Sequence, residues 1–373
     1  MKEKLAKRLV ADMMNWNLER ATQEFAWLEL MVHYKFDDYQ QYGPGNRFYV
    51  YLLRWLSQYP SGGDREWAWR LLRDELIYLN QEEMNHLVSL TGPVIEREMR
   101  AAVAGRLALP VYMVEQDAEA QRLLREMRCR TLYVGVSDGA RIDVYRRFNE
   151  HTVNNEQVVA MIEISANKQK GLKKKLRKRL DAMGSTAPDT FAWVCLIDDF
   201  TASGTTSIRF EDGEWDGKVR RFLDEVKMTN DEAPLISEDA HIQVHHYLAS
   251  HVAKENVTQR LAQFGSEQGS RRFIPSFSYV LPQEIVVTRS THTEISLLLE
   301  DRYDPGIETS HTGPCIALGY KNGGLPLVLY HNTPNNTVAT VWARSDTKSP
   351  NYIPEKQMSP LFPRRQRHSD VRP

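Results

Sequence analysis

The sequence predicts an α/β protein in which a parallel sheet follows a stretch of helices. Residues 1–125 carry apolar side chains at three- and four-residue spacing, which is typical of amphipathic helices. From residue 126 onward, short runs rich in Val, Ile and aromatic residues alternate with helix-like or loop segments, which indicates parallel strands buried on both faces. We therefore expect a helical accessory domain over 1–125, an α/β domain over 126–343 and a Pro-rich, basic tail over 344–373.

The individual elements follow from these patterns. Helices are expected over 22–36, 46–59 and 65–90, separated by Pro- and Gly-rich loops, and no catalytic pattern occurs among them. In the tail, 360–363 (PLFP) reads as an apolar clip onto the body of the protein. The strand candidates are 131–136, 157–164, 191–197, 241–249, 278–288, 315–320 and 325–333.

The bulk composition excludes several classes of protein. With 373 residues, 42% hydrophobic and 26% charged, the chain suits a globular protein of one large or two ordinary domains. A net charge of -1 gives no overall attraction to polyanions, so any nucleic-acid contact must be local. Three scattered cysteines, no secretory h-region and no long apolar run predict a protein of the reducing cytoplasm.

The stretch VCLIDDFTASGTT, 194–206, is the most informative one. A buried strand ends in Asp198 and Asp199, where ligands of open parallel sheets sit. Two carboxylates there can accept hydrogen bonds from vicinal hydroxyls. In the small-residue loop that follows, Gly204 permits close backbone approach, so amides can form an anion-binding nest. The loop residues are Thr201, Ala202, Ser203, Gly204, Thr205 and Thr206. The alternative to a ligand site is a strand that simply ends in a solvated acidic turn.

This motif resembles the PRPP-binding motif of the type I phosphoribosyltransferases, where PRPP is 5-phosphoribosyl-1-pyrophosphate. The resemblance implies a phosphoribosyltransferase-like parallel sheet, with Asp198 and Asp199 on the 2- and 3-hydroxyls and 201–206 on the 5-phosphate. It also implies Mg²⁺, brought by the bound pyrophosphate. Some purine-using members have a catalytic Asp where this chain has Ala202, while adenine- and orotate-type members have Ala, so the loop assigns no base.

A second small-residue turn follows the strand at 131–136. In the same family a loop at this place grips pyrophosphate through backbone amides, usually with a basic residue. Here the turn would be made by Ser137, Asp138, Gly139 and Ala140, with Arg141 as the cation that neutralises the leaving group. Alternatively, Arg141 only caps a helix through Asp138 or Asp143.

Three further segments extend the resemblance over most of the chain. Residues 71–80 (LLRDELIYLN), 318–342 and 359–365 (SPLFPRR) look like the phosphoribosyltransferase-like effectors of bacterial antiphage systems, including those encoded beside retron reverse transcriptases. That implies a toxic effector held by a reverse transcriptase with its RNA-linked single-stranded DNA, often with a helix-turn-helix protein. By position, the acceptor side would be lined by His331, Asn332, Thr333, Asn335 and Asn336. The alternative is a turn that needs Asn and Pro.

The run 168–180, KQKGLKKKLRKRL, has eight positive charges and no acid. On a helix, Leu172, Leu176 and Leu180 form one stripe and the basic residues cover the rest. Lys173, Lys174 and Lys175 are candidates for contacts with nucleic-acid phosphates. A plain solvated helix and a mobile flap over the active site are the alternatives. The four histidines of 241–251 lack metal-ligand spacing, and we expect no metal held by the protein alone.

Together these features predict Mg²⁺-dependent chemistry at ribose C1 of PRPP or of a nucleotide. Either phosphoribosyl transfer to a base or cleavage of a glycosidic bond satisfies the motif, and Asp198, Asp199 and Arg141 are the catalytic candidates. The competing class is a non-catalytic regulatory subunit that senses PRPP or a nucleotide.

Overall fold

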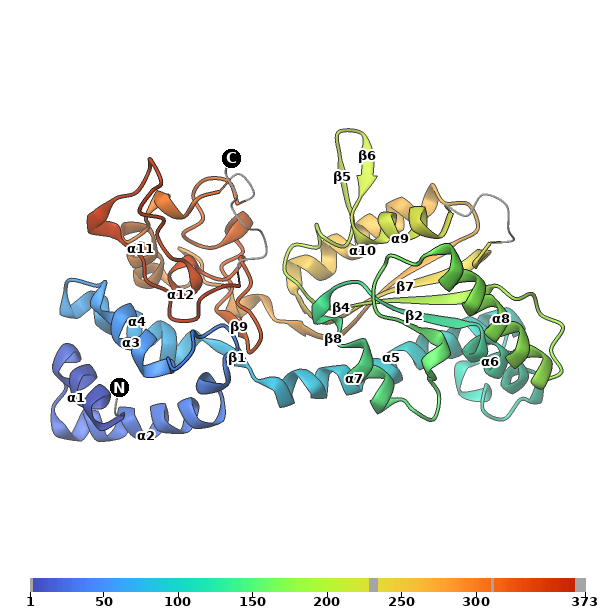
Figure 1. Cartoon of the computed structure of the whole chain (residues 1–373), viewed down its shortest axis with the longest axis horizontal. Helices are drawn as coiled ribbons and strands as arrows, with labels where there is room; N and C mark the ends of the chain where they lie inside the picture. Colours follow the sequence, from blue (N-terminus) through green and yellow to red (C-terminus); the bar gives the residue numbers. More distant parts are fainter. Residues whose placement is uncertain (1–2, 228–233, 310–311, 366–373) are drawn as a thin grey trace. The chain divides into compact units, whose positions relative to one another are not determined.

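The computed structural model describes residues 3–227, 234–309 and 312–365 (Figure 1). It divides into two compact units: unit 1 is Met1–Glu83 with Glu284–Pro373, and unit 2 is Met84–Gln283. These units are not the ranges 1–125, 126–343 and 344–373 expected from the sequence, because the chain leaves unit 1 near the start of one long helix and returns to it after the last sheet strand.

Unit 2 contains a five-stranded, all-parallel sheet, which confirms the predicted α/β fold class. The strand order is β3-β2-β4-β7-β8, so the first of these strands along the chain lies between the second and the third. The strands are β2 (Thr131–Gly135), β3 (Val158–Val159), β4 (Phe191–Thr201), β7 (Ile236–Ser250) and β8 (Arg272–Leu281).

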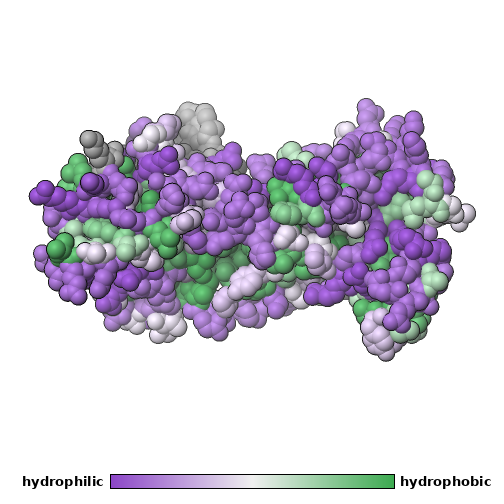
Figure 2. Space-filling model, turned by 90° about the horizontal axis from the view of Figure 1, so that it is seen from below, coloured by the Kyte–Doolittle hydropathy of each residue, from purple (hydrophilic) through white to green (hydrophobic). Residues whose placement is uncertain are grey.

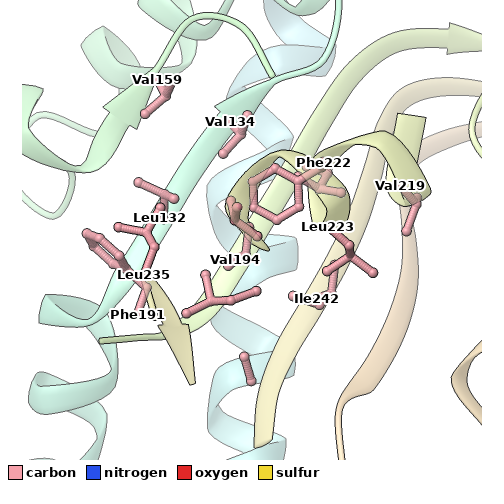
Figure 3. Close-up of a cluster of buried hydrophobic side chains, with 14 of the residues drawn as sticks. Leu132, Val134, Val159, Phe191, Val194, Val219, Phe222, Leu223, Leu235 and Ile242 are labelled. Carbon is pink, nitrogen blue, oxygen red and sulfur yellow. The ribbon is translucent and has the colours of Figure 1, made fainter. Parts of the chain in front are cut away.

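Helices cover both faces of this sheet, which explains why β2 and β4 read as continuous apolar runs. On one face, strand residues that include Leu132, Val134, Val194, Leu196, Ile242 and Val244 pack against α8 (Ala166–Ala182), α9 (Lys218–Lys227) and α10 (His251–Ser266). Figure 3 shows part of this core, with Phe222 and Leu223 of α9 over Val194 and Ile242. On the other face, Tyr145 of α7 (Ile142–Phe148) lies 5.3 Å from Tyr133, measured between ring centroids.

Several strand predictions need correction. Only two residues of 157–164 form a strand, while β7 extends well beyond 241–249. β8 begins before the predicted 278, and 283–285 is a 3₁₀ turn. The segment 315–320 forms no strand. Between β4 and α9, the chain forms a hairpin of β5 (Arg209–Glu211) and β6 (Glu214–Asp216), which is not among the predicted strands.

Unit 1 is mostly helical. It contains α1 (Glu3–Met14), α2 (Leu18–Tyr34), α3 (Phe48–Ser57), α4 (Gly62–Arg70), α11 (Thr293–Asp301) and α12 (Ala339–Trp342). The helix expected over 65–90 is interrupted by β1 (Ile77–Leu79), which pairs in parallel with β9 (Leu327–Leu329); α5 (Gln81–Leu107) then continues into unit 2.

The C-terminal segment is anchored to unit 1 by an aromatic side chain. Phe362 is fully buried and its ring lies 5.2–5.7 Å from the rings of Phe36, Tyr39, Phe48 and Tyr78, measured between centroids. Tyr39 also donates a hydrogen bond to the carbonyl of Pro363 (2.7 Å). The predicted apolar clip is therefore confirmed.

The surface carries mainly polar side chains on the face drawn in Figure 2. Among the described residues, no helix combines the length and the hydropathy that a membrane span requires. Cys129, Cys195 and Cys315 are all free thiols.

Candidate functional site

The two predicted loops meet at one point of the sheet in unit 2. β2 has β3 on one side and β4 on the other, so the direction in which strands are added reverses between β2 and β4. Ligands of open α/β sheets bind outside the carboxyl ends of the strands at such a switch point. The turn 137–141 follows β2, and the loop 201–206 follows β4. The structure thus brings both sets of predicted residues to the place where this architecture binds ligands.

The two aspartates at the end of β4 face opposite sides of the sheet, as neighbouring strand residues do. Asp198 is buried, with 2% of its surface exposed. Its carboxylate accepts hydrogen bonds from the Ser137 hydroxyl and the backbone N–H of Asp199 (3.2 Å), and it forms an ion pair with Lys218. Asp198 is thus held entirely by protein groups.

Asp199 is half-buried and lies against the turn after β2. Its Oδ1 accepts a hydrogen bond from the backbone N–H of Phe200 (2.8 Å). A Cβ added to Gly139 would collide with the Asp199 carboxylate, so only glycine allows this approach. Arg141, next in the turn, adopts a left-handed backbone conformation (φ 44°). The Tyr247 hydroxyl donates to the Ala140 carbonyl and supports the turn from β7.

Burial controls the electrostatics of this edge. It raises the pKa of Asp198, and the neighbouring charge of Asp199 adds to the rise, while Lys218 opposes it. Burial likewise lowers the pKa of Arg141, although Asp199 and Asp143 counteract the change. The pKa of His246 falls to about 3 because the imidazole is buried and faces the Lys218 charge. His246 is therefore neutral at physiological pH.

The loop 201–206 is held through its carbonyl groups. The Ala202 carbonyl accepts from the Ser250 hydroxyl (2.6 Å), and the Ser203 carbonyl accepts from the Asn256 amide (3.1 Å). Within the described parts of the chain, the N–H groups of Ser203, Thr205 and Thr206 donate to no protein acceptor. An anion is the natural partner for such a group of available backbone donors.

Side chains within the loop add to this arrangement. The Ser203 and Thr205 hydroxyls lie 2.8 Å apart, and Thr201 accepts from the Gly204 N–H (3.2 Å). Gly204 has φ +76°, and an added Cβ would lie 2.9 Å from a methyl group of Val257. The loop therefore needs glycine for its backbone angle and for its packing.

Two residues of the site were missed in the sequence. Lys218 is the first residue of α9. It lies 20 residues after Asp198, beyond the β5–β6 hairpin, and no local sequence motif includes it. His246 is opposite Asp198 in the β4–β7 register and bonds to Ser207 (Nε2–Oγ 2.8 Å). Its strand was predicted, but its register with β4 depends on tertiary pairing.

A cavity of about 10 Å³, roughly the space for one water molecule, adjoins the cluster of Asp198, Lys218 and His246. Its lining is Val136, Leu196, Asp198, Ser207, Lys218, Val219, Val244 and His246.

His331 and Asn332 belong to unit 1 and lie in the turn after β9, whereas the loops 137–141 and 201–206 belong to unit 2. The His331 carbonyl accepts from the Gln41 side chain (2.8 Å), and the Asn332 side chain accepts from the backbone N–H of Arg365 (2.9 Å). These contacts tie the turn to its own unit. An acceptor-side role for the two residues stays a prediction.

The basic run forms α8, as predicted. Leu172, Leu176 and Leu180 are buried, which confirms the apolar stripe. The charges are less isolated than expected, because Lys175 lies 3.7 Å from Glu156 and Arg177 pairs with Asp181. A contact with nucleic acid stays a prediction. Across the described ranges, no group of three or more His, Cys, Asp or Glu residues could hold a metal ion.

Comparison with known proteins agrees with this arrangement. A family model described as PRTase-CE matches residues 52–364. No curated protein and no solved structure matches the chain. Since the family model covers well over half of the sequence, the chain belongs to the PRTase-CE family, a phosphoribosyltransferase-type family.

Proposed function

We propose that unit 2 binds a ribose 5-phosphate ester, either PRPP or a nucleotide, and acts at ribose C1. One observation carries the proposal: the loop after β4 is anchored by its carbonyls and presents backbone N–H groups at the switch point, beside Asp199. This arrangement suits a phosphate and a sugar hydroxyl held side by side. Family membership supports the same substrate class.

Each part of the site then has a task. The amides and hydroxyls of 203–206 bind the 5-phosphate, and Asp199 accepts from a ribose hydroxyl. The turn 137–140 and Arg141 face the group that leaves C1, where a cation offsets the charge that develops on it. Holding the reactants in line provides the remaining acceleration, because an oxocarbenium-like transition state needs little covalent help.

The donor set suits Mg²⁺ that arrives with the ligand. Mg²⁺ usually keeps several waters and binds through substrate phosphates with one or two carboxylates. At this edge of the sheet Asp198 forms an ion pair with Lys218. Asp199 is therefore the carboxylate that would bind Mg²⁺ together with the substrate phosphates. When bound, Mg²⁺ would neutralise part of the pyrophosphate charge.

Product analysis tests the proposal. The purified protein is mixed with PRPP and a panel of bases, and separately with nucleotides, and released pyrophosphate or base is measured. We expect turnover that Asp199→Asn abolishes. Asp181→Asn is the matched control, because Asp181 is an exposed carboxylate paired with Arg177 on α8. PRPP binding without any product would favour the sensor alternative.

We further propose that the chain is a toxic cytoplasmic effector of a retron antiphage system. The support is the resemblance of 71–80, 318–342 and 359–365 to such effectors, together with the basic surface of α8. Expression of the protein alone should arrest growth, and Asp199→Asn should relieve the arrest. Co-expression of the retron reverse transcriptase with its RNA-linked DNA and the helix-turn-helix protein should also relieve it. Growth arrest by Asp199→Asn at equal expression would contradict this role.

A further inference from the structure

We infer that the two aspartates have separate tasks: Asp199 contacts the ligand, whereas Asp198 is a positioning residue clamped by Lys218. The inference rests on the proposed function and deepens it. It departs from the expectation that both acids hold ribose hydroxyls, and it assigns a role to Lys218, which the sequence did not reveal.

The bonding of Asp198 is the first argument. One carboxylate oxygen accepts from the Ser137 hydroxyl and the Asp199 N–H, and the other is paired with the Lys218 ammonium. The side chain is only 3% exposed. A buried carboxylate is tolerated when it is paired and hydrogen-bonded in this way. Asp198 therefore needs no ligand to satisfy it.

The surroundings of Asp198 are the second argument. Its side chain lies on the face of the sheet covered by α9, opposite to the face on which Asp199 meets Gly139. The adjoining cavity of about 10 Å³ suits one water molecule and cannot admit a ribose. A sugar hydroxyl could reach Asp198 only by displacing the Ser137 hydroxyl from one oxygen or Lys218 from the other, and the Lys218 charge would then lose its partner.

The connections that the clamp makes are the third argument. Ser137 begins the turn after β2, Asp198 lies near the carboxyl end of β4, and Lys218 begins α9. The backbone N–H of Lys218 also donates to the Thr206 carbonyl (3.0 Å), at the last residue of the loop 201–206. One buried carboxylate thus joins both ligand loops across the switch point. The Asp198–Lys218 pair also joins the two ends of the segment 199–217, which includes the β5–β6 hairpin.

Titration calorimetry with PRPP and Mg²⁺ tests the clamp on the full chain. The proteins are the wild type, Asp199→Asn, Asp198→Asn, Lys218→Met, Lys218→Arg and the double variant Asp198→Asn/Lys218→Met. The melting temperature of each is recorded, and affinities are measured below the lowest melting transition. The double variant contains no unpaired buried charge, so it keeps the test open if a single variant folds poorly.

A positioning role predicts non-additive losses of affinity. Asp199→Asn should weaken PRPP binding by about ten-fold or more, as expected for a lost charge-assisted hydrogen bond. Lys218→Met should also weaken binding although Asp198 is intact, and the double variant should bind no more weakly than the poorer single variant. Lys218→Arg, which keeps the ion pair, should restore affinity to near the wild-type value.

Two outcomes overturn the clamp. If Lys218→Met binds PRPP as tightly as the wild type or more tightly, while Asp198→Asn loses as much affinity as Asp199→Asn, Asp198 is a ligand contact. If Asp198→Asn and Lys218→Met alter melting alone and leave affinity unchanged, the pair is merely structural. Failure of the wild type to bind PRPP or any nucleoside 5-phosphate would instead count against the proposed function, and the inference would fall with it.

Discussion

At Gly204 the loop 201–206 turns through a backbone conformation that L side chains rarely adopt. Gly204→Ala combines positive φ with contact against Val257, so we expect a loss of about 1–2 kcal/mol of unfolding free energy and loss of phosphate-ligand binding. Gly213→Ala is the matched control. Gly213 has φ +84°, but an added Cβ there meets no atom within 4 Å.

Chemical denaturation with and without PRPP distinguishes the two variants. Both should lose stability, and only Gly204→Ala should lose the stabilisation that PRPP gives. Equal responses to PRPP would show that the loop does not hold the phosphate.

The residue scale also shows what the sequence could and could not predict. Small residues after a strand form a local motif, so the sequence could predict 137–141 and 201–206 as candidate ligand loops, and what they bind stays a prediction. Lys218 and His246 reach Asp198 through helix packing and strand register, which are tertiary properties. The opposite orientations of Asp198 and Asp199 follow from strand periodicity, but the face covered by α9 does not.

Among the elements, α8 carries basic residues that can be replaced without changing the loops 137–141 and 201–206. Replacing Lys173, Lys174 and Lys175 with Gln removes three charges and keeps helix propensity. If these residues contact phosphates, affinity for a nucleic-acid partner should fall, and the log–log salt slope should shrink by up to about one unit per lost contact. Electrophoretic mobility shift or filter binding with single-stranded DNA at several salt concentrations measures the slope.

Gly171→Ala is the control on the same helix. An added Cβ meets nothing within 4 Å, so this variant should gain about 0.5–1 kcal/mol of stability with an unchanged slope. If the triple variant has the same log–log salt slope as the wild type, α8 is a solvated helix that does not contact nucleic acid. Loss of PRPP binding in the triple variant would make it a flap over the site.

β7 buries two imidazoles, which predicts a pH dependence of stability. Burial lowers the pKa of His245 and of His246 to about 3, below the ordinary 6.5. The unfolded chain therefore binds protons that the folded chain does not, and stability falls as pH drops from about 6.5 toward 3. Each histidine contributes up to about 1.4 kcal/mol per pH unit. The raised pKa of Asp198 acts with the opposite sign.

Urea unfolding at pH 7 and pH 5.5 measures this effect. We expect a lower unfolding free energy at pH 5.5 and a shallower dependence in His245→Gln. His245 bonds to Ser276 and Ser278 on β8, so the amide can keep part of that network. If His245→Gln shows the same pH dependence as the wild type, burial of neutral His245 does not contribute to it.

For the whole molecule, the sequence predicted the class of fold but not how the chain divides. Alternating strands and helices after residue 126 correctly indicated a parallel sheet. The pairing of β1 with β9 brings together segments from the two ends of the chain, and no local pattern reports such a contact. Unit 1 therefore contains both chain ends, and its core includes Phe362.

This organisation makes the C-terminal segment structural. Phe362→Ala should cost about 3–5 kcal/mol of unfolding free energy, because a fully buried ring is removed from an aromatic cluster. Leu297→Ala, on α11 of the same unit, is the control because Leu297 is 57% exposed. Chemical denaturation monitored by tryptophan fluorescence provides the comparison. Equal, small effects would mean that the segment is a dispensable tail.

The melting temperature with and without PRPP and Mg²⁺ tests the central claim most directly. A ligand that binds only the folded state at about one hundred times its Kd adds about 2.7 kcal/mol of stability, so the wild type should melt higher. Gly139→Ala, which displaces Asp199, should abolish the rise, while Gly105→Ala, which meets nothing within 4 Å on α5, should keep it. A wild type whose melting temperature is unchanged by millimolar PRPP or nucleoside 5-phosphates would contradict a ribose-phosphate site at the β2–β4 switch point.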